Sequence, residues 1–262
     1  MFINKKNNQT LSTFFLLVFS LFLLPSCSKQ EEKRTEDLTF DELKQKTLSS
    51  LERKKADASI ENLEKLISQH PDNQNISEYK LMLADLYFDN GNLPSAYELY
   101  KHYTEFYPSD PKAEYASYRS ILSKFYQTLK PDCDQTDTDD AIKLCKNFIT
   151  NPKFHEYKSD VKDIQNTCER KLIDKEVYVY NFYLKKGNYK AAQNRLNYLR
   201  NNYLEKNPAL EARLLFLECK LEHKQKNKTA VDEKIETLLD KYPDSHFTKM
   251  AQRVVNKNVF LF

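Results

Sequence analysis

The segment from Tyr79 to Pro111 reads YKLMLADLYFDNGNLPSAYELYKHYTEFYPSDP and predicts two helices joined by a tight turn. Apolar and aromatic residues recur at helical spacing before Gly91 and again after Asn92, and Pro108 closes the second run. Glycine suits the left-handed backbone on which many helices end. Small residues such as Ala84 and Ala96 let two antiparallel helices approach closely. The segment therefore predicts a helical hairpin.

The same landmarks return along the chain and resemble the tetratricopeptide repeat. One small or apolar marker falls in the expected second helix of each hairpin: Ser59, Ala96, Ala141, Ala192 and Val231. These markers are about 37 to 51 residues apart, whereas an ideal array repeats near 34. We therefore expect an all-α fold, a stretched tetratricopeptide-like α-solenoid of about five helical hairpins, over residues 40–256.

The composition excludes several other classes of protein. Only two glycines, nine prolines and no extended alternating runs argue against a sheet. Because Gly91 and Gly187 both end predicted helices, a glycine-rich phosphate loop is excluded. None of the five histidines pairs with another at helical spacing: His70, His102, His155, His223 and His246. We expect no catalytic residue, no metal and no cofactor other than a covalent lipid.

Residues 1–26 are predicted to be a lipoprotein signal peptide. Lys5 and Lys6 precede an apolar run that is too short to cross a bilayer, which needs about 20 residues. The run ends in Leu24-Pro25-Ser26-Cys27, which resembles a bacterial lipobox and makes Cys27 the expected lipid attachment site. An uncleaved signal anchor is the alternative. By the same resemblance, Ser28 after the cysteine implies the outer membrane.

Charged residues after the lipobox predict a flexible tether over residues 27–39. The apolar residues after Asn258 predict a C-terminal tail, 257–262, that either docks on the last hairpin or frays. Without the signal peptide, whose only charged residues are Lys5 and Lys6, the net charge of +3 falls to +1. This balance argues against a nucleic-acid partner.

Five carboxylates gather near residues 130–138, the longest predicted loop: Asp132, Asp134, Asp137, Asp139 and Asp140. They lack the turn glycine and closing glutamate of a calcium loop. We expect Asp137 or Thr138 to cap the next helix instead, with Asp139 and Asp140 complementing its dipole. A long helix is predicted over 154–186, with an apolar seam of Val161, Ile164, Cys168, Leu172, Val179 and Phe182.

Four cysteines follow Cys27, and their state is open from sequence: Cys133, Cys145, Cys168 and Cys219. A bridge between Cys145 and Cys168, or between Cys133 and either, is one reading, and buried free thiols are the other. Tyrosines on the expected first helices are candidates for a substrate groove, although the same residues are equally compatible with the core: Tyr79, Tyr87, Tyr115 and Tyr118.

Three further features make the chain resemble the BamD family, the lipoproteins of the outer-membrane β-barrel assembly machinery. They are the segment YPSDPKAEYASYR at residues 107–119, the aspartate-rich loop, and a spaced motif at Lys175, Glu176, Val179, Phe182 or Tyr183, Gly187, Tyr189, Ala191 and Arg195. Ile121, where many members have glycine, and Leu204, where the pattern has proline, depart from the family.

The resemblance implies a non-enzymatic scaffold, lipid-anchored in the outer membrane and facing the periplasm. It implies that C-terminal hairpins bind a BamA-type barrel-inserting protein, with Arg195 at the contact. N-terminal hairpins would receive unfolded outer-membrane proteins, and other assembly-machinery lipoproteins would be partners. The alternative is a tetratricopeptide lipoprotein that coordinates peptidoglycan synthesis.

Overall fold

The computed structural model describes residues 38–256, so the predicted signal peptide, most of the tether and the C-terminal tail lie outside the described residues. In the described part every regular element is an α-helix. The helices are α2 (Phe40–Glu52), α3 (Ala56–Gln69), α4 (Ile76–Asp89), α5 (Leu93–Phe106), α6 (Ala113–Gln127), α7 (Thr136–Thr150), α8 (Lys158–Lys185), α9 (Tyr189–Tyr203), α10 (Leu210–Lys224), α11 (Lys228–Lys241) and α12 (His246–Asn256).

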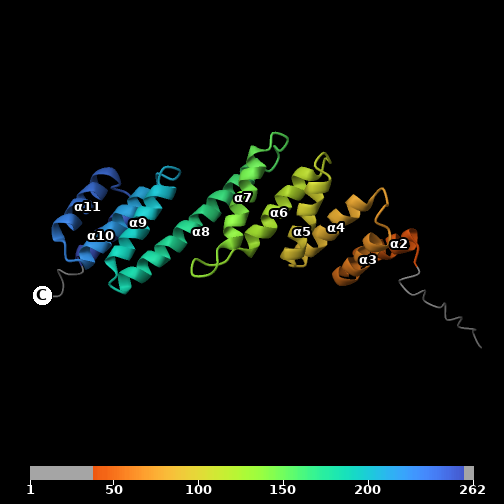
Figure 1. Ribbon diagram of the computed structural model, residues 1–262, viewed down its shortest axis with the longest axis horizontal. Coiled ribbons are helices and arrows are strands. Elements are labelled where there is room, and N and C mark those ends of the chain that lie inside the picture. Colours follow the sequence, from red (N-terminus) through yellow and green to blue (C-terminus); the bar gives the residue numbers. More distant parts are fainter. Residues whose placement is uncertain (1–37, 257–262) are drawn as a thin grey trace, which may run out of the picture.

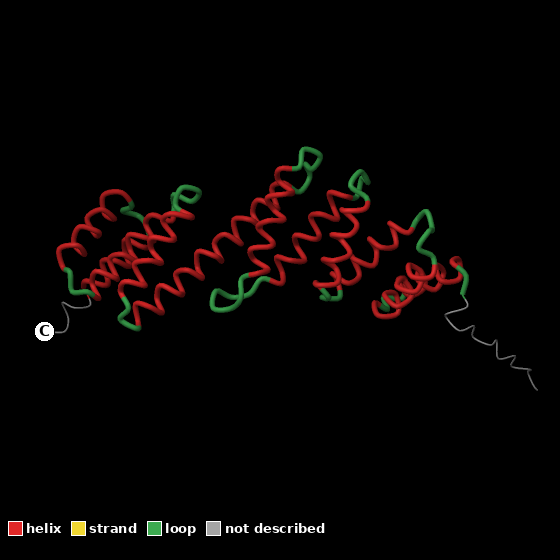
Figure 2. The backbone as a smooth tube through the Cα atoms, viewed as in Figure 1, coloured by secondary structure: helices red, strands yellow, loops and turns green. Residues whose placement is uncertain are grey.

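The helices form five antiparallel hairpins that stack side by side into an elongated solenoid, from α2 at one end to α11 at the other (Figure 1). The hairpins are α2–α3, α4–α5, α6–α7, α8–α9 and α10–α11, and α12 packs mainly on α10. The turns inside the hairpins lie along one long edge, and the turns between hairpins lie along the other (Figure 2). The predicted all-α solenoid of about five hairpins is confirmed.

Small markers sit where the helices cross. Four of the five second-helix markers, Ser59, Ala96, Ala141 and Ala192, are fully buried, and Val231 is 3% exposed. At Ser59 the hydroxyl lies in the core and shares a 2.9 Å hydrogen bond with the hydroxyl of Ser50 on the neighbouring helix. The irregular intervals between these markers in the sequence therefore correspond to the intervals between helix crossings along the chain.

Four of the five turns within hairpins end their first helix in the same way. A residue with positive φ follows the helix: Lys54 (53°), Gly91 (79°), Gly187 (75°) and Lys226 (61°). In the second hairpin the amide of Gly91 donates to the carbonyl of Phe88 at 3.0 Å, and the amide of Asn92 donates to the carbonyl of Tyr87 at 2.8 Å. This pair of bonds is the Schellman motif, and it recurs in the other three turns.

An asparagine begins the second helix in three of these hairpins. The side chains of Asn92, Asn188 and Asn227 each accept a hydrogen bond from the backbone amide three residues later. Such a side chain satisfies one of the helix's first free amides. Lys55 holds this place in the first hairpin and provides no side-chain cap.

The third hairpin corrects the prediction for the aspartate-rich loop. Helix α7 begins at Thr136, so the predicted caps Asp137 and Thr138 are already helical and Gln135 holds the N-cap position without a capping bond. Asp137 instead pairs with Lys124 of α6 at 2.9 Å. The position of Asp137 and Asp139 in the first turn still complements the helix dipole.

Helix α8 begins at Lys158, four residues later than predicted, because a side chain from another helix holds the preceding turn. The carboxylate of Glu114, on α6, accepts backbone hydrogen bonds from His155 and Glu156 at 2.6 Å each, and from Tyr157 at 3.3 Å. A carboxylate suits the positive end of the helix. Local sequence does not reveal such a cap, since Glu114 lies about forty residues away in the chain.

The predicted seam of α8 is correct only in its first half. Val161, Ile164 and Cys168 join a core with α6 and α7, and Leu172 packs against it. In the second half the buried apolar residues are Ile173, Val177, Tyr180 and Leu184, which join a separate core with α9 to α12. Val179 is only partly buried and Phe182 is 51% exposed. The buried face shifts because α8 changes its packing partner from α7 to α9.

Candidate protein-binding surfaces

A polar cluster ties three helices of the N-terminal half together around Asp85 of α4. The same carboxylate oxygen of Asp85 accepts hydrogen bonds from the hydroxyls of Tyr100 on α5, at 2.5 Å, and Tyr115 on α6, at 2.7 Å. Burial, followed by the bond to Asp85, raises the pKa of Tyr115 to about 12 and that of the fully buried Tyr100 still further. Both tyrosines therefore act as neutral hydrogen-bond donors at physiological pH.

Arg119 of α6 completes this cluster. Its Nε donates to the hydroxyl of Tyr100 at 3.0 Å, and its Nη2 pairs with Asp89 at 3.2 Å. The guanidinium lies 3.8 Å from the centroid of the Phe88 ring, a cation–π distance. The ring of Phe88 in turn contacts that of Tyr126, which is 58% exposed. Aromatic and charged groups thus meet at the surface of α4 and α6, the first helices of two hairpins.

The four tyrosines predicted for a groove occupy different environments. Tyr79 is 8% exposed and packs against Phe40, so its ring belongs to the core. Tyr87 is partly buried and donates its hydroxyl to Glu64; burial first and that bond second raise its pKa to about 12. Tyr118 is partly buried and stacks on Tyr157 with ring centroids 4.4 Å apart. Tyr115 is also partly buried, and its hydroxyl donates to Asp85. Of the four tyrosines, Tyr87, Tyr115 and Tyr118 therefore keep part of the ring accessible to a ligand.

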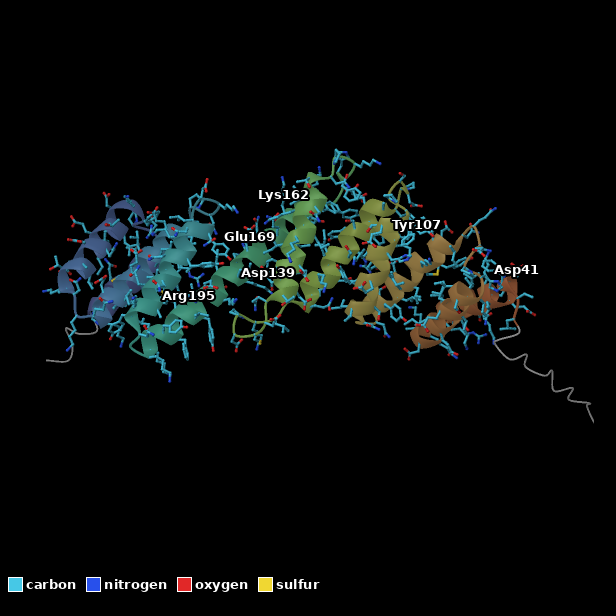
Figure 3. The ribbon with its side chains drawn as sticks, in the orientation of Figure 1. Asp41, Tyr107, Asp139, Lys162, Glu169 and Arg195 are labelled. Atoms are coloured by element: carbon cyan, nitrogen blue, oxygen red, sulfur yellow. The ribbon has the colours of Figure 1, made fainter. Side chains whose placement is uncertain are left out.

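Arg195 lies in the C-terminal half of the solenoid, far from Asp41 at the other end (Figure 3). Its Nη1 pairs with Glu176 of α8 at 3.2 Å. The Glu176 side chain is 8% exposed, whereas that of Arg195 is 39% exposed. The guanidinium therefore covers a buried carboxylate of its own chain and keeps an exposed side.

Other ion pairs fasten the helices of the same half. Arg213 on α10 reaches Asp174 on α8 at 2.7 Å. Glu218, also on α10 and 12% exposed, pairs with Arg200 on α9 at 2.6 Å and with Lys234 on α11 at 2.8 Å. Buried or partly buried pairs that link several helices fix their relative positions.

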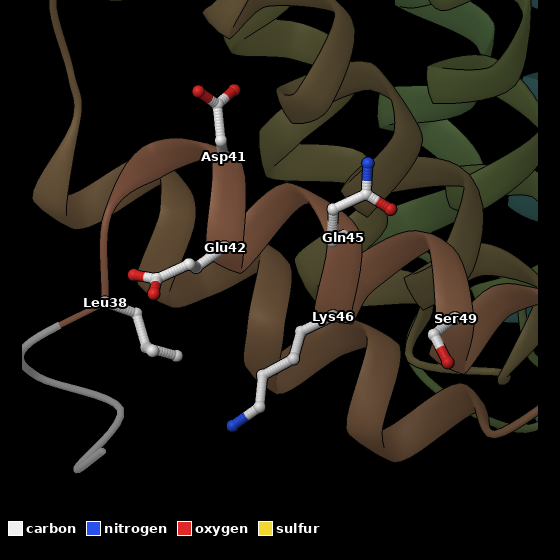
Figure 4. A pocket seen from close by; sticks show the side chains of 6 residues that line it. All are labelled: Leu38, Asp41, Glu42, Gln45, Lys46 and Ser49. Carbon is white, nitrogen blue, oxygen red and sulfur yellow. The ribbon is translucent and has the colours of Figure 1, made fainter. Parts of the chain in front are cut away.

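A shallow depression lies on the outer face of α2 (Figure 4). It is lined by Leu38, Asp41, Glu42, Gln45, Lys46 and Ser49. Glu42 forms a capping box with Thr39, and its carboxylate accepts a 2.9 Å hydrogen bond from the backbone amide of Thr39. The depression comprises one helix face and brings no residue from a second helix beside it, which makes it a poor site for a small molecule.

The four cysteines of the described region are free thiols. Cys133 is exposed, and Cys145, Cys168 and Cys219 are fully buried. Burial raises the pKa of Cys145 to about 12 and those of Cys168 and Cys219 to about 11. The buried thiols are therefore protonated at neutral pH and pack as small apolar side chains.

Residues 38–256 contain neither a metal-binding cluster nor a membrane-spanning helix. No group of histidine, cysteine, aspartate and glutamate side chains there is arranged to hold a metal ion. No helix in that range has the length and apolar character needed to cross a membrane. Cys27 lies outside the described residues, and its lipid attachment stays a prediction.

Stacked hairpins with broad exposed faces define a tetratricopeptide-like α-solenoid, a class of fold that binds other macromolecules along extended surfaces. Within this fold class, the sequence assigns the chain to one family. Residues 36–230 match the family model YfiO, described as outer membrane lipoprotein, and the chain belongs to this family.

Two relatives bear the name outer membrane protein assembly factor BamD. That of Rickettsia prowazekii (strain Madrid E) is 26% identical over 244 residues, which cover 92% of this chain and 94% of the relative. That of Caulobacter vibrioides (strain ATCC 19089 / CIP 103742 / CB 15) is 23% identical over 142 residues, 54% of this chain and 47% of the relative. The resemblance to the BamD family is confirmed.

Solved structures of similar arrangement are more distant. A tetratricopeptide repeat protein from Parabacteroides merdae ATCC 43184 has 14% identity and a TM-score of 0.36, covering 84% of this chain and 75% of its own. PilW, a type IV pilus biogenesis factor, has 13% identity and a TM-score of 0.30, with coverage of 82% and 83%. These likenesses are weak, and the fold assignment depends on the helices themselves.

Sequence reasoning missed the Asp85 cluster and the partner of Arg195. The segment YPSDPKAEYASYR contains two members of the cluster, Tyr115 and Arg119, but Asp85 carries no sign of its two tyrosine donors. Glu176 and Arg195 belong to one motif and lie on the facing helices of one hairpin. Opposite charges on the two sides of the Gly187 turn were the available signal for that pair.

Proposed function

We propose that this protein is a non-enzymatic scaffold lipoprotein of the outer-membrane β-barrel assembly machinery. The observation that carries the proposal is the likeness to an outer membrane protein assembly factor over 92% of the chain. The family description, outer membrane lipoprotein, agrees with it. The solenoid supports a scaffold role, because its stacked hairpins present long, rigid faces rather than an enclosed pocket.

The proposed partners divide between the two halves. The C-terminal hairpins bind the periplasmic domains of a BamA-type protein, and the N-terminal hairpins receive unfolded outer-membrane proteins. Other lipoproteins of the machinery complete the complex. The boundary between two cores within α8 supports this division, since the first half of α8 packs with α6 and α7 and its second half with α9 to α12.

Co-purification after cross-linking in cells tests the assignment. The full chain should recover a BamA-type barrel protein as a major cross-linked partner. A chain that recovers enzymes of peptidoglycan synthesis, and no barrel protein, would overturn it in favour of the other scaffold role.

We further propose that Cys27 carries the lipid that anchors the protein to the periplasmic face of the outer membrane. The short apolar run and Leu24-Pro25-Ser26-Cys27 support this assignment. Mass spectrometry of the mature protein should find an acylated cysteine at its N-terminus. Cys27→Ala should abolish acylation, whereas Cys133→Ser, which removes an exposed thiol of the solenoid, should leave it intact. A dominant unprocessed chain that begins at Met1 would contradict the proposal.

For Arg195 we propose a contact with a carboxylate of the BamA-type partner, made by the exposed side of its guanidinium. Its pairing with Glu176 complicates a simple charge reversal, because Arg195→Glu places two carboxylates together inside the protein. A better test compares Glu176→Gln with the double variant Glu176→Gln/Arg195→Gln, in both of which the buried position is neutral.

The double variant should bind the partner about tenfold more weakly than Glu176→Gln, a difference of about 1.4 kcal/mol. Thermal unfolding should be similar for the two variants, which separates binding from folding. Equal binding by both would show that Arg195 serves only the internal pair.

For the substrate groove we propose the partly buried tyrosines Tyr87, Tyr115 and Tyr118. Photoreactive residues at these sites should cross-link unfolded outer-membrane proteins in cells. The same probe at the buried position Tyr79 is the matched control, since its ring lies in the core. Equal cross-linking at Tyr79 would mean that the probe itself had disturbed the fold.

A further inference from the structure

Two neighbouring turns at the C-terminal end of the solenoid form a basic corner. Its members are exposed lysines of the α8–α9 and α10–α11 turns: Lys185, Lys186, Lys190, Lys224, Lys226 and Lys228. Both turns lie on the same long edge of the molecule (Figure 2). The near-neutral net charge of the whole chain conceals this concentration.

Contacts between the helices hold the two turns together. The hydroxyl of Tyr189, at the start of α9, donates to the carbonyl of Lys224 at the end of α10, at 3.2 Å. One turn further back, Nζ of Lys220 donates to Asn181 of α8 at 3.0 Å. The pKa of Lys220 is lowered, first by burial and then by the charge of Lys224. The lysines of the two turns therefore share one surface.

The ammonium groups of the corner have no anionic partner within the described residues, where none of the six forms an ion pair of 4 Å or less. The sequence contains no aspartate or glutamate from Val177 to Leu204. The nearest carboxylates along the chain are Glu222, which accepts a hydrogen bond from Asn227, and Asp232, one turn into α11. The corner is thus a site of uncompensated positive charge.

Two exposed aromatic rings lie near the C-terminal end of α8, which leads into the basic corner. Tyr178 and Phe182 lie one turn apart on the same face of α8, and each is 51% exposed. Nζ of Lys186 is 5.9 Å from the centroid of the Phe182 ring. Aromatic rings next to lysines are typical of protein surfaces that settle at the headgroup level of a membrane.

We propose that the basic corner, with Phe182, binds the anionic phospholipid headgroups of a bilayer surface. The choice of lipid over an acidic protein follows from the composition of the corner, which holds lysines and no arginine. Arginine matches the fixed geometry of a single carboxylate, whereas lysine is a mobile point charge that suits a fluid array of phosphates. Clustered lysines near an anionic membrane are attracted to its negative surface potential.

The proposal rests on the proposed anchoring of the chain at a membrane, which brings the corner within reach of lipid. The described chain begins at Leu38, at the end of the solenoid opposite the corner. A contact at the corner would give the molecule a second attachment and lay its long axis along the bilayer.

The absence of tryptophan from the sequence makes a direct experiment available. Phe182→Trp gives the full mature protein a single reporter in the corner. Phe106→Trp is the matched control, because Phe106 is 65% exposed and ends α5 on the opposite edge. Each protein is studied with vesicles of phosphatidylcholine alone and with vesicles that also contain phosphatidylglycerol, some carrying brominated chains as quenchers.

The emission of Phe182→Trp should shift to the blue and be quenched in phosphatidylglycerol vesicles, and high salt should reverse both effects. Replacing all six lysines by glutamine in that background should weaken the response at least about tenfold. Phe106→Trp should not respond. A response of Phe182→Trp that is the same in neutral vesicles, or matched by Phe106→Trp, would overturn the proposal.

A photoreactive residue at position 182 tests the same proposal in cells. It should form adducts with phospholipid, and adducts with a protein in place of lipid would overturn the choice of occupant. The vesicle response does not require acylation of Cys27. If mass spectrometry finds no lipid on the native protein and the vesicle response persists, the anchor is overturned and the corner stands.

Discussion

At the scale of single residues, two lysines occupy backbone positions better suited to glycine. Lys54 and Lys226 have φ values of 53° and 61° at the places that Gly91 and Gly187 hold in other hairpins. A side chain with a Cβ in this left-handed region costs about 1–2 kcal/mol. A glycine at these positions would avoid this cost, but glycine loses more conformational entropy on folding, which offsets part of the stability gained.

Lys54→Gly should therefore stabilise the protein by up to about 1 kcal/mol, measured by urea unfolding. Lys54→Ala is the control, because it removes the same charge and keeps the Cβ. If alanine stabilised the protein as much as glycine, the effect would belong to the lysine side chain and not to the backbone.

Asp85 is the shared acceptor of the polar cluster in the N-terminal half. Asp85→Ala leaves the hydroxyl of the fully buried Tyr100 without its acceptor, and should destabilise the protein by about 1–3 kcal/mol. Asp89→Ala is the matched control, since Asp89 is 71% exposed and its pair with Arg119 contributes at most about 1 kcal/mol. Equal losses for the two variants in thermal unfolding would contradict a central role for Asp85.

High pH should weaken the fold through the same tyrosines. The folded-state pKa values of Tyr87 and Tyr115 are raised to about 12 from the ordinary value of 10.0, first by burial and then by their carboxylate partners. Their contribution to stability is complete below pH 10 and is lost as the pH rises through 12. The unfolding midpoint in urea should fall across that window, and Tyr87→Phe should reduce the fall.

At the scale of elements, the helix crossings are the most sensitive points. Ala96 and Ala192 are fully buried, so Ala96→Leu or Ala192→Leu should overpack a crossing and cost about 1–3 kcal/mol. Ala209→Leu, at an exposed position before α10, provides the control. Circular dichroism melts measure the effect, and unchanged melts for both variants would remove these alanines from the crossings.

Sequence patterns predicted these elements well where the signal is local. Ala96 and Gly187 were found because a crossing needs a small side chain and a left-handed turn favours glycine. The start of α8 was missed because Glu114, distant in sequence, holds the turn before it. Phe182 was placed in the seam because helical spacing alone does not register a change of packing partner.

At the scale of the whole molecule, the candidate surfaces were less accessible to sequence reasoning than the fold. Arg195 was singled out by resemblance, but its pair with Glu176 depends on two helices lying face to face. The basic corner depends on the same kind of proximity, because its lysines come from two separate turns. Groups that meet only through stacking of hairpins leave little trace in a linear pattern.

The division of α8 between two cores also has an angular consequence. Leu172 packs against one core and the next residue, Ile173, belongs to the other. The continuous helix α8 therefore sets the rotation of one half of the molecule relative to the other about the helix axis. One alanine inserted between these residues should turn the C-terminal half by about 100° and advance it by about 1.5 Å. Seven residues should restore the direction to within about 20° while lengthening the helix by about 10.5 Å.

Spin-label distances between Lys55 and Lys228 would follow both changes. A partner that contacts both halves should be lost with one added residue, and one that contacts a single half should be retained. Unchanged distances after the single insertion would mean that the surrounding helices, and not α8, fix the orientation. If α8 fixes the relative orientation of the two halves, the number of residues in this one helix determines which of their faces point in the same direction.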